Sequence, residues 1–171
     1  MSIGGASVPL DPDLDTLINV TALGEPAPSA RFMGGREHDL ATGGSYPEPT
    51  PDDLDAILAD EIMLMPSLAN ETGPFKGHET SWVGGEPKVG TGERGAAVAL
   101  YLALVTSECL SSIGHDGTII VEGPFASNQT YLEMLTVASG SQVSRALGST
   151  GTSAGAALLT IETTELPAVQ D

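Results

Sequence analysis

The longest stretch of regularly spaced apolar residues lies in the middle of the chain, between Glu93 and Ile113. Apolar side chains occupy every position from Ala96 to Val105. This pattern predicts a helix that is apolar around most of its circumference and is therefore buried on several sides. The strongly apolar part is too short to span a bilayer, and Gly114 is expected to end the helix.

Two short apolar runs, each followed by a turn of small residues, come after this helix. Residues 118–121 and 142–147 are predicted strands, and a helix between them starts at Ser127 or Asn128 and ends at Gly140. A glycine-rich turn at 150–156 leads into a last predicted helix. If the two strands are parallel, both turns lie side by side at their carboxyl ends, where backbone N–H groups can face a ligand.

The first half of the chain shows weaker periodicity. Residues 16–23 are rich in β-branched side chains, and a turn separates them from residues 29–33, which together predict a β-hairpin. A short helix is expected at 36–41. Thr50 or Asp52 should cap another helix, and residues 69–92 form a long loop that holds the single tryptophan, Trp82.

The charge balance narrows the range of partners. The chain has 23 acidic and 6 basic residues, so its formal net charge is −17. This charge repels a phosphate backbone and an anionic lipid surface, and we therefore expect neither a nucleic-acid nor a membrane partner. An anionic ligand such as ATP would need Mg²⁺ and backbone donors. The acidity also fits a high-salt habitat, and composition leaves that interpretation open.

The chain has a single cysteine, Cys109, which excludes an intramolecular disulfide and a cysteine-based metal cluster. Its place inside the apolar helix favours a small core residue. The N-terminal residues show neither the basic region nor the apolar core of a signal peptide. A cytoplasmic location is therefore expected.

Candidate chemistry is concentrated in the two small-residue turns. Gly123 does not stand in a G-x-G-x-x-G pattern, and no G-x-x-x-x-G-K-[ST] pattern occurs in the chain, so a dinucleotide fingerprint at this turn and a P-loop are not supported. The two turns together can form the walls of a slot for an adenine ring. His115 and Asp116 suggest a catalytic pair, although Asp-Gly before a strand is ordinary turn chemistry and is favoured.

Several separated motifs resemble the C-terminal lobe of FGGY-family carbohydrate kinases. They are residues 119–128 with the helix that follows, residues 150–159, residues 29–37, residues 73–75, and the helix at 94–104. The resemblance covers nearly the whole chain. It implies an α/β fold of the ribonuclease H-like, actin-like ATPase type, with a mixed sheet, helices packed against it, and residues 1–171 as an N-terminally truncated nucleotide-binding lobe.

The resemblance also implies a site for ATP. By carry-over, the adenosine-binding loop would comprise Gly123, Pro124, Phe125, Ala126, Ser127 and Asn128, and the second wall of the site would include Thr150, Gly151, Gly155 and Ala156. Many family members have three consecutive glycines near the positions of Pro124 and Phe125. How closely the backbone can approach the ligand therefore differs at these two positions. Mg²⁺ would be bound mainly through the phosphates and the absent lobe.

The family's N-terminal lobe, catalytic aspartate and phosphate-binding turn would all lie before Met1. The expectation is therefore a part of a kinase that transfers the ATP γ-phosphoryl group to a ketose or polyol, with no catalytic residue of its own and no activity alone. Self-association, or pairing with the N-terminal lobe, is expected because a sheet edge would lack its partner.

Two other functions remain as alternatives. One is a non-catalytic nucleotide-binding or interaction module of the same fold. The other is a small hydrolase using His115, Asp116 and a serine. Five further side chains could border a cleft, although ion pairs or loop anchoring explain them equally well: Arg31, Arg36, Glu37, His78 and Trp82.

Overall fold

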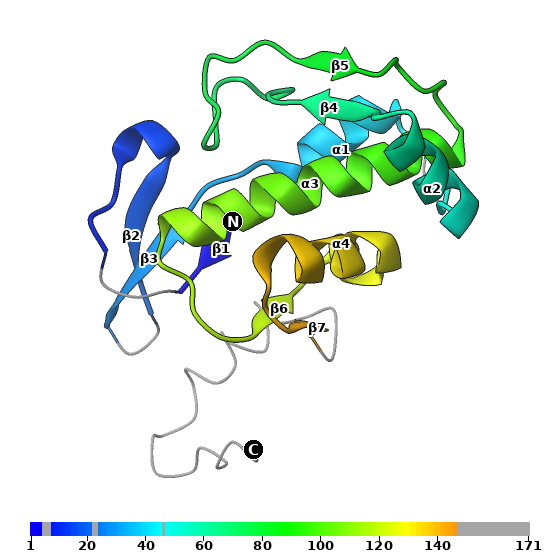
Figure 1. The fold of residues 1–171 in the computed structure, drawn as a ribbon. Coiled ribbons are helices and arrows are strands. Elements are labelled where there is room, and N and C mark those ends of the chain that lie inside the picture. The colour runs from blue at the N-terminus through cyan, green and yellow to red at the C-terminus, as the bar shows by residue number, and fades with distance from the viewer. Residues whose placement is uncertain (5–7, 22–23, 46, 147–171) are drawn as a thin grey trace.

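The computed structural model describes residues 1–4, 8–21, 24–45 and 47–146 (Figure 1). The long helix α3 (Gly92–Ser112) crosses the molecule, and Figure 1 shows β4 and β5 on one side of it and α4, β6 and β7 on the other. Thr91 caps α3 by accepting a hydrogen bond from the Arg94 backbone N–H (3.3 Å). The predicted central helix is thus confirmed.

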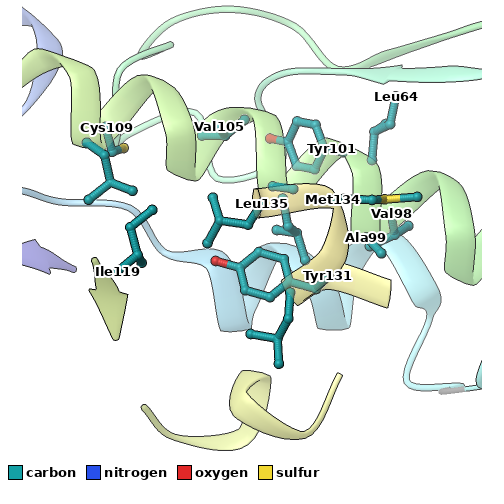
Figure 2. Close-up of a cluster of buried hydrophobic side chains, with 14 of the residues drawn as sticks. Leu64, Val98, Ala99, Tyr101, Val105, Cys109, Ile119, Tyr131, Met134 and Leu135 are labelled. Atoms are coloured by element: carbon teal, nitrogen blue, oxygen red, sulfur yellow. The ribbon is translucent and has the colours of Figure 1, made fainter. Parts of the chain in front are cut away.

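The hydrophobic core surrounds α3, as its all-round apolar pattern predicts. Val98, Leu102 and Cys109 of α3 are fully buried, and Figure 2 shows side chains from β4, β6 and α4 gathered against this helix. Cys109 is a core residue, as expected, and burial raises the pKa of its thiol to about 12. Among the described helices, α3 alone is long and apolar enough to meet a length and composition test for crossing a membrane.

The N-terminal sheet is a hairpin with one added strand. β2 (Thr16–Val20) pairs antiparallel with β3 (Pro26–Ala30), and β1 (Ser2–Ile3) pairs with the other edge of β3. The hairpin was predicted, but its second strand begins before residue 29. The two-residue β1 was not predicted, because so short a strand shows no periodicity.

The Asp15 carboxylate connects the two ends of the hairpin to each other and to the loop after β4. The one-turn 3₁₀ helix η1 (Pro12–Leu14) ends at Asp15, whose carboxylate lies 2.7 Å from an Arg31 guanidinium nitrogen. The same carboxylate accepts a hydrogen bond from the Gly73 backbone N–H (2.9 Å). The hydrogen bond from Arg31 is the main cause that lowers the pKa of Asp15.

Two short helices and a second hairpin follow along the chain. α1 (Gly34–Thr42) matches the helix expected at 36–41, and α2 (Pro51–Ala59) begins at a capping box in which Thr50 and Asp53 bond reciprocally. β4 (Met63–Met65) pairs with β5 (Ser81–Val83). The long loop expected at 69–92 is thus interrupted by a strand, because Leu64 lies opposite Trp82 and both side chains face the core.

The segment with the first small-residue turn has the predicted strand–helix–strand order. β6 (Ile119–Val121) is followed by the 3₁₀ helix η2 (Pro124–Ser127), by α4 (Gln129–Ser139) and by β7 (Val143–Arg145). β6 and β7 are parallel, with Ile119 opposite Val143. The helix expected after residue 150 lies outside the described residues.

The described strands form three small sheets, ordered β1-β3-β2, β4-β5 and β6-β7. The mixed α/β class is confirmed, with antiparallel and parallel pairs and helices packed between them. The single mixed sheet of the sequence-based expectation is not present among the described residues. Assignment to the ribonuclease H-like type remains a prediction.

Candidate functional site

The turn between β6 and α4 is built from a glycine and two capping bonds. Gly123 has a φ of 78°, a conformation that strongly favours glycine. The backbone N–H of Asn128 donates to the Phe125 carbonyl (3.1 Å) and closes η2. The Asn128 side-chain oxygen then accepts from the Tyr131 backbone N–H (2.9 Å) and starts α4. Asn128 therefore fixes the exit of the turn and the entry of the helix.

A cleft of about 730 Å³ lies beside this turn. Its volume falls in the usual range of small-molecule sites, roughly 300–1,000 Å³. The turn contributes three residues, one face of α1 contributes four, and the remainder come from the segment before α2 and from the first turn of α3. These lining residues are Phe125, Ser127 and Asn128; Gly35, His38, Asp39 and Thr42; and Pro47, Glu48, Pro49 and Gly95.

His38 and Phe125 place two rings in contact on the wall of this cleft, and Phe125 continues to a third ring, Tyr131, outside its lining. The imidazole of His38 meets the ring of Phe125 edge-on, with centroids 5.3 Å apart and planes at 89°. Phe125 in turn contacts Tyr131 at 5.4 Å. Burial lowers the pKa of His38 below its usual value, so its imidazole is neutral at pH 7. Burial also raises the pKa of Tyr131, whose hydroxyl donates to Thr106 Oγ1 (3.1 Å).

The charge of the cleft suits a neutral ligand group. Asp39 and Glu48 are the charged side chains among its described lining residues, which include no lysine or arginine. Two carboxylates would repel a phosphate group placed among them. The lining does supply hydrogen-bonding groups for a neutral heterocycle or a sugar hydroxyl, from His38, Thr42 and Asn128.

A second cleft, of about 430 Å³, lies between β1 and β6. Leu102 of α3 and Leu135 of α4 are part of its lining. Phe125 and Gly35 line both clefts, so Phe125 lies at the boundary between them. Among the described residues, β1 and β6 each lie at an edge of their own sheet.

The predicted site residues fall into three groups. Phe125, Ser127 and Asn128 line the larger cleft. Gly123 is exposed at the start of the turn, Ala126 is half-buried within it, and Pro124 is the first residue of η2. Thr150, Gly151, Gly155 and Ala156 lie outside the described residues. The contribution of α1 was not predicted from the sequence.

The spacing of the polar residues along α1 is the sequence signal that could have placed this helix at the candidate site. Gly35, His38, Asp39 and Thr42 recur at intervals of three and four residues, which places them on one helical face. This face is polar and carries a histidine, whereas a face that packs only into a core is apolar. Nothing in the local pattern shows that this face lies against the turn after β6.

The other candidate side chains have structural partners. Arg31 pairs with Asp15, and Trp82 lies under the Arg94 guanidinium (5.0 Å to the ring centroid), as expected for a loop anchor. His78 is exposed and stacks edge-on against Phe75 at 6.0 Å. His115 Nε2 lies 3.0 Å from the Gly117 carbonyl oxygen, within the turn that the sequence favours.

Glu37 and Arg36, two neighbours on α1, differ sharply in exposure. Arg36 is exposed. Glu37 is buried, and its carboxylate accepts hydrogen bonds from the Tyr101 hydroxyl and from the Ala69 backbone N–H (3.3 Å). Glu37 thereby connects α1, α3 and the loop after β4, and it does not line the larger cleft.

The described residues do not fit a resident metal. They contain no group of three or more His, Cys, Asp or Glu side chains placed to hold an ion.

Comparisons with a family model and with a solved structure agree with each other. The family model described as carbohydrate kinase FGGY, C-terminal domain, matches residues 1–168. A solved structure, that of a carbohydrate kinase from Novosphingobium aromaticivorans, is 34% identical to the chain with a TM-score of 0.75. The match covers 88% of this chain and 33% of that one, so the chain spans about a third of its relative. No curated protein sequence matches significantly.

Proposed function

Because the chain belongs to the FGGY carbohydrate kinase family, as its C-terminal domain, we propose that it binds the adenosine part of ATP in the larger cleft. In the whole kinase, the γ-phosphoryl group would be transferred to a hydroxyl of a ketose or polyol. The chain would supply the nucleotide end of that reaction.

One observation carries this proposal. Phe125, Ser127 and Asn128, named from the sequence as part of an adenosine loop, lie together on a cleft of about 730 Å³. Adenosine is a largely apolar, neutral body with a few hydrogen-bonding edges. A half-open cleft with aromatic rings, a hydroxyl, an amide and no lysine or arginine among its described lining residues suits such a group.

The phosphates would extend away from the cleft. The carboxylates of Asp39 and Glu48 would repel phosphate groups inside the cleft. Phosphoryl transfer itself depends on positioning and on positive charge around the γ-phosphate. Since the chain spans about a third of its relative, those groups would come from polypeptide outside residues 1–171. The chain alone is therefore expected to bind nucleotide and to phosphorylate no sugar.

Titration with Mg²⁺–ADP, followed by calorimetry and by melting temperature, tests the binding. Wild-type chain should show saturable binding and a higher melting temperature. Ser127→Tyr should abolish both effects, because a bulky ring on the cleft wall occupies the space of the ligand. Ser111→Tyr, at an exposed serine of α3 away from both clefts, is the matched control. Equal binding by both variants, or no binding by wild type, would contradict the proposal.

A further inference from the structure

Phe125 stands between the larger and the smaller cleft. Phe125 of η2 and Gly35 of α1 are the two described residues that line both of them. On the side of the larger cleft, the Phe125 ring meets His38 edge-on, with centroids 5.3 Å apart. On the side of the smaller cleft, it contacts Tyr131 at 5.4 Å. The Phe125 ring is therefore held between one ring from each cleft.

The Phe125 ring also reaches from the turn to the backbone of α1. A Cβ atom added to Gly35 would lie 4.0 Å from Phe125 Cε2, which is an ordinary van der Waals contact. Because Gly35 carries no side chain, the edge of the ring occupies the space beside the first turn of α1. The ring thereby separates the two clefts at the place where the turn approaches the helix.

The space behind the ring is apolar. Leu102 of α3, Ile119 of β6 and Leu135 of α4 line the smaller cleft, and all three are buried. The volume of this cleft, about 430 Å³, is ample for a phenyl group. Such a lining favours an apolar group over a polar one. If the Phe125 ring were shortened, an apolar substituent on a ligand in the larger cleft would have this space to enter.

We infer that Phe125 limits the size of the base, so that the larger cleft accepts an unsubstituted purine and rejects one with a bulky apolar substituent. This inference rests on the proposed nucleotide site and adds to it the residue that limits base size. The alternative is that Phe125 only packs against His38 and Tyr131. The two differ in whether a shorter side chain at position 125 changes which nucleotides bind.

The test compares binding of Mg²⁺–ADP, by calorimetry, with that of two analogues that carry a benzyl group on N6 or on C8 of the base. Wild-type chain should bind both analogues about 10-fold or more weaker than ADP, because a steric clash discriminates against the larger ligand. Phe125→Ala should remove this difference for at least one analogue. Phe125→Leu lacks the Cε2 atom that approaches Gly35 and should remove part of it.

A side chain supplied from α1 should restore the limit. In the double variant Phe125→Ala, Gly35→Leu, the new leucine points toward the place of the missing ring, and both analogues should again bind more weakly than ADP. Val121→Ala is the matched control, because it enlarges the smaller cleft and leaves Phe125 in place. This variant should keep the wild-type ratio of affinities.

Weak binding of both analogues to Phe125→Ala and to Phe125→Leu, with ADP still bound, overturns the inference and leaves Phe125 as a packing residue. Equal binding of ADP and both analogues to wild type also overturns it. So does the loss of all nucleotide binding in both variants with unchanged circular dichroism, because the ring would then hold the base rather than limit its size. Absence of ADP binding to wild type overturns the proposed function itself, so the two kinds of failure are distinguishable.

Discussion

At the scale of single residues, the buried polar side chains in the described part of the chain are paired, and several pairs join elements that are distant in sequence. The Glu37 carboxylate accepts a hydrogen bond from the Tyr101 hydroxyl. The Asp15 carboxylate accepts hydrogen bonds from the Arg31 guanidinium and from the Gly73 backbone N–H. A buried carboxylate without such donors would be strongly unfavourable. The described buried side chains include no nitrogen or oxygen without a hydrogen-bond partner.

The Cys109 thiol should be unreactive in the native protein. It is fully buried and its pKa is raised to about 12, so little of the nucleophilic thiolate exists at pH 8 and reagent cannot reach it. A thiol-specific reagent should label the chain rapidly in denaturant and far more slowly without it. Complete labelling of the native chain within minutes would contradict this picture of the core.

The Asp15–Arg31 pair should make stability depend on acid pH. The pKa of Asp15 is lower in the folded chain than its ordinary value, so its stabilisation is fully present above about pH 4. It is lost as the pH falls through the lower folded value. Acid unfolding curves of Asp15→Asn should be flatter in this range. Asp13→Asn, at an exposed carboxylate of the same turn, serves as the comparison, and identical curves for the two variants would refute the effect.

At the scale of elements, a helix cap fixes the point at which the turn of the candidate site ends and α4 begins. Predicted and observed boundaries agree well where a cap is present, as at Thr50 for α2 and Asn128 for α4. β1 and β5 were not predicted, because neither strand has a local signal in the sequence. The Asn128 cap matters for function because the same residue lines the larger cleft.

Asn128→Ala should destabilise the chain by about 1 kcal/mol, since it removes the acceptor for the Tyr131 N–H. The same change should weaken nucleotide binding, because the turn at η2 loses its fixed exit. Asn128→Asp keeps the capping oxygen and should keep most of the stability, as chemical denaturation can measure. If alanine and aspartate cost the same stability, capping by Asn128 is not the cause.

At the scale of the whole molecule, the terminal strands β1 and β6 both border the smaller cleft. Ile120 of β6 is 66% exposed there, and Ile3 of β1 is 61% exposed. Apolar side chains on strand edges favour pairing with another strand. We propose that these edges pair with a second copy or with an N-terminal lobe, and that the net charge of −17 opposes self-pairing at low salt.

Sedimentation velocity at several concentrations should therefore show self-association that increases with salt. Ile120→Lys places a charge on the edge of β6 and should shift the chain toward monomer. Val137→Lys adds the same charge on the exposed side of α4, away from both clefts, and should leave association unchanged. A monomer at all salt concentrations in wild type would count against pairing of copies through this edge.

Local signals in the sequence determined the central helix, the hairpin, the capped helices and the strand–helix–strand unit, because periodicity and caps act within a few residues. They also placed Phe125, Ser127 and Asn128 in one turn. Only the tertiary structure decided that a polar face of α1 lies against that turn and that Glu37 is buried rather than at a cleft. Such contacts join residues far apart in the chain, where packing and burial, rather than local pattern, choose the partner.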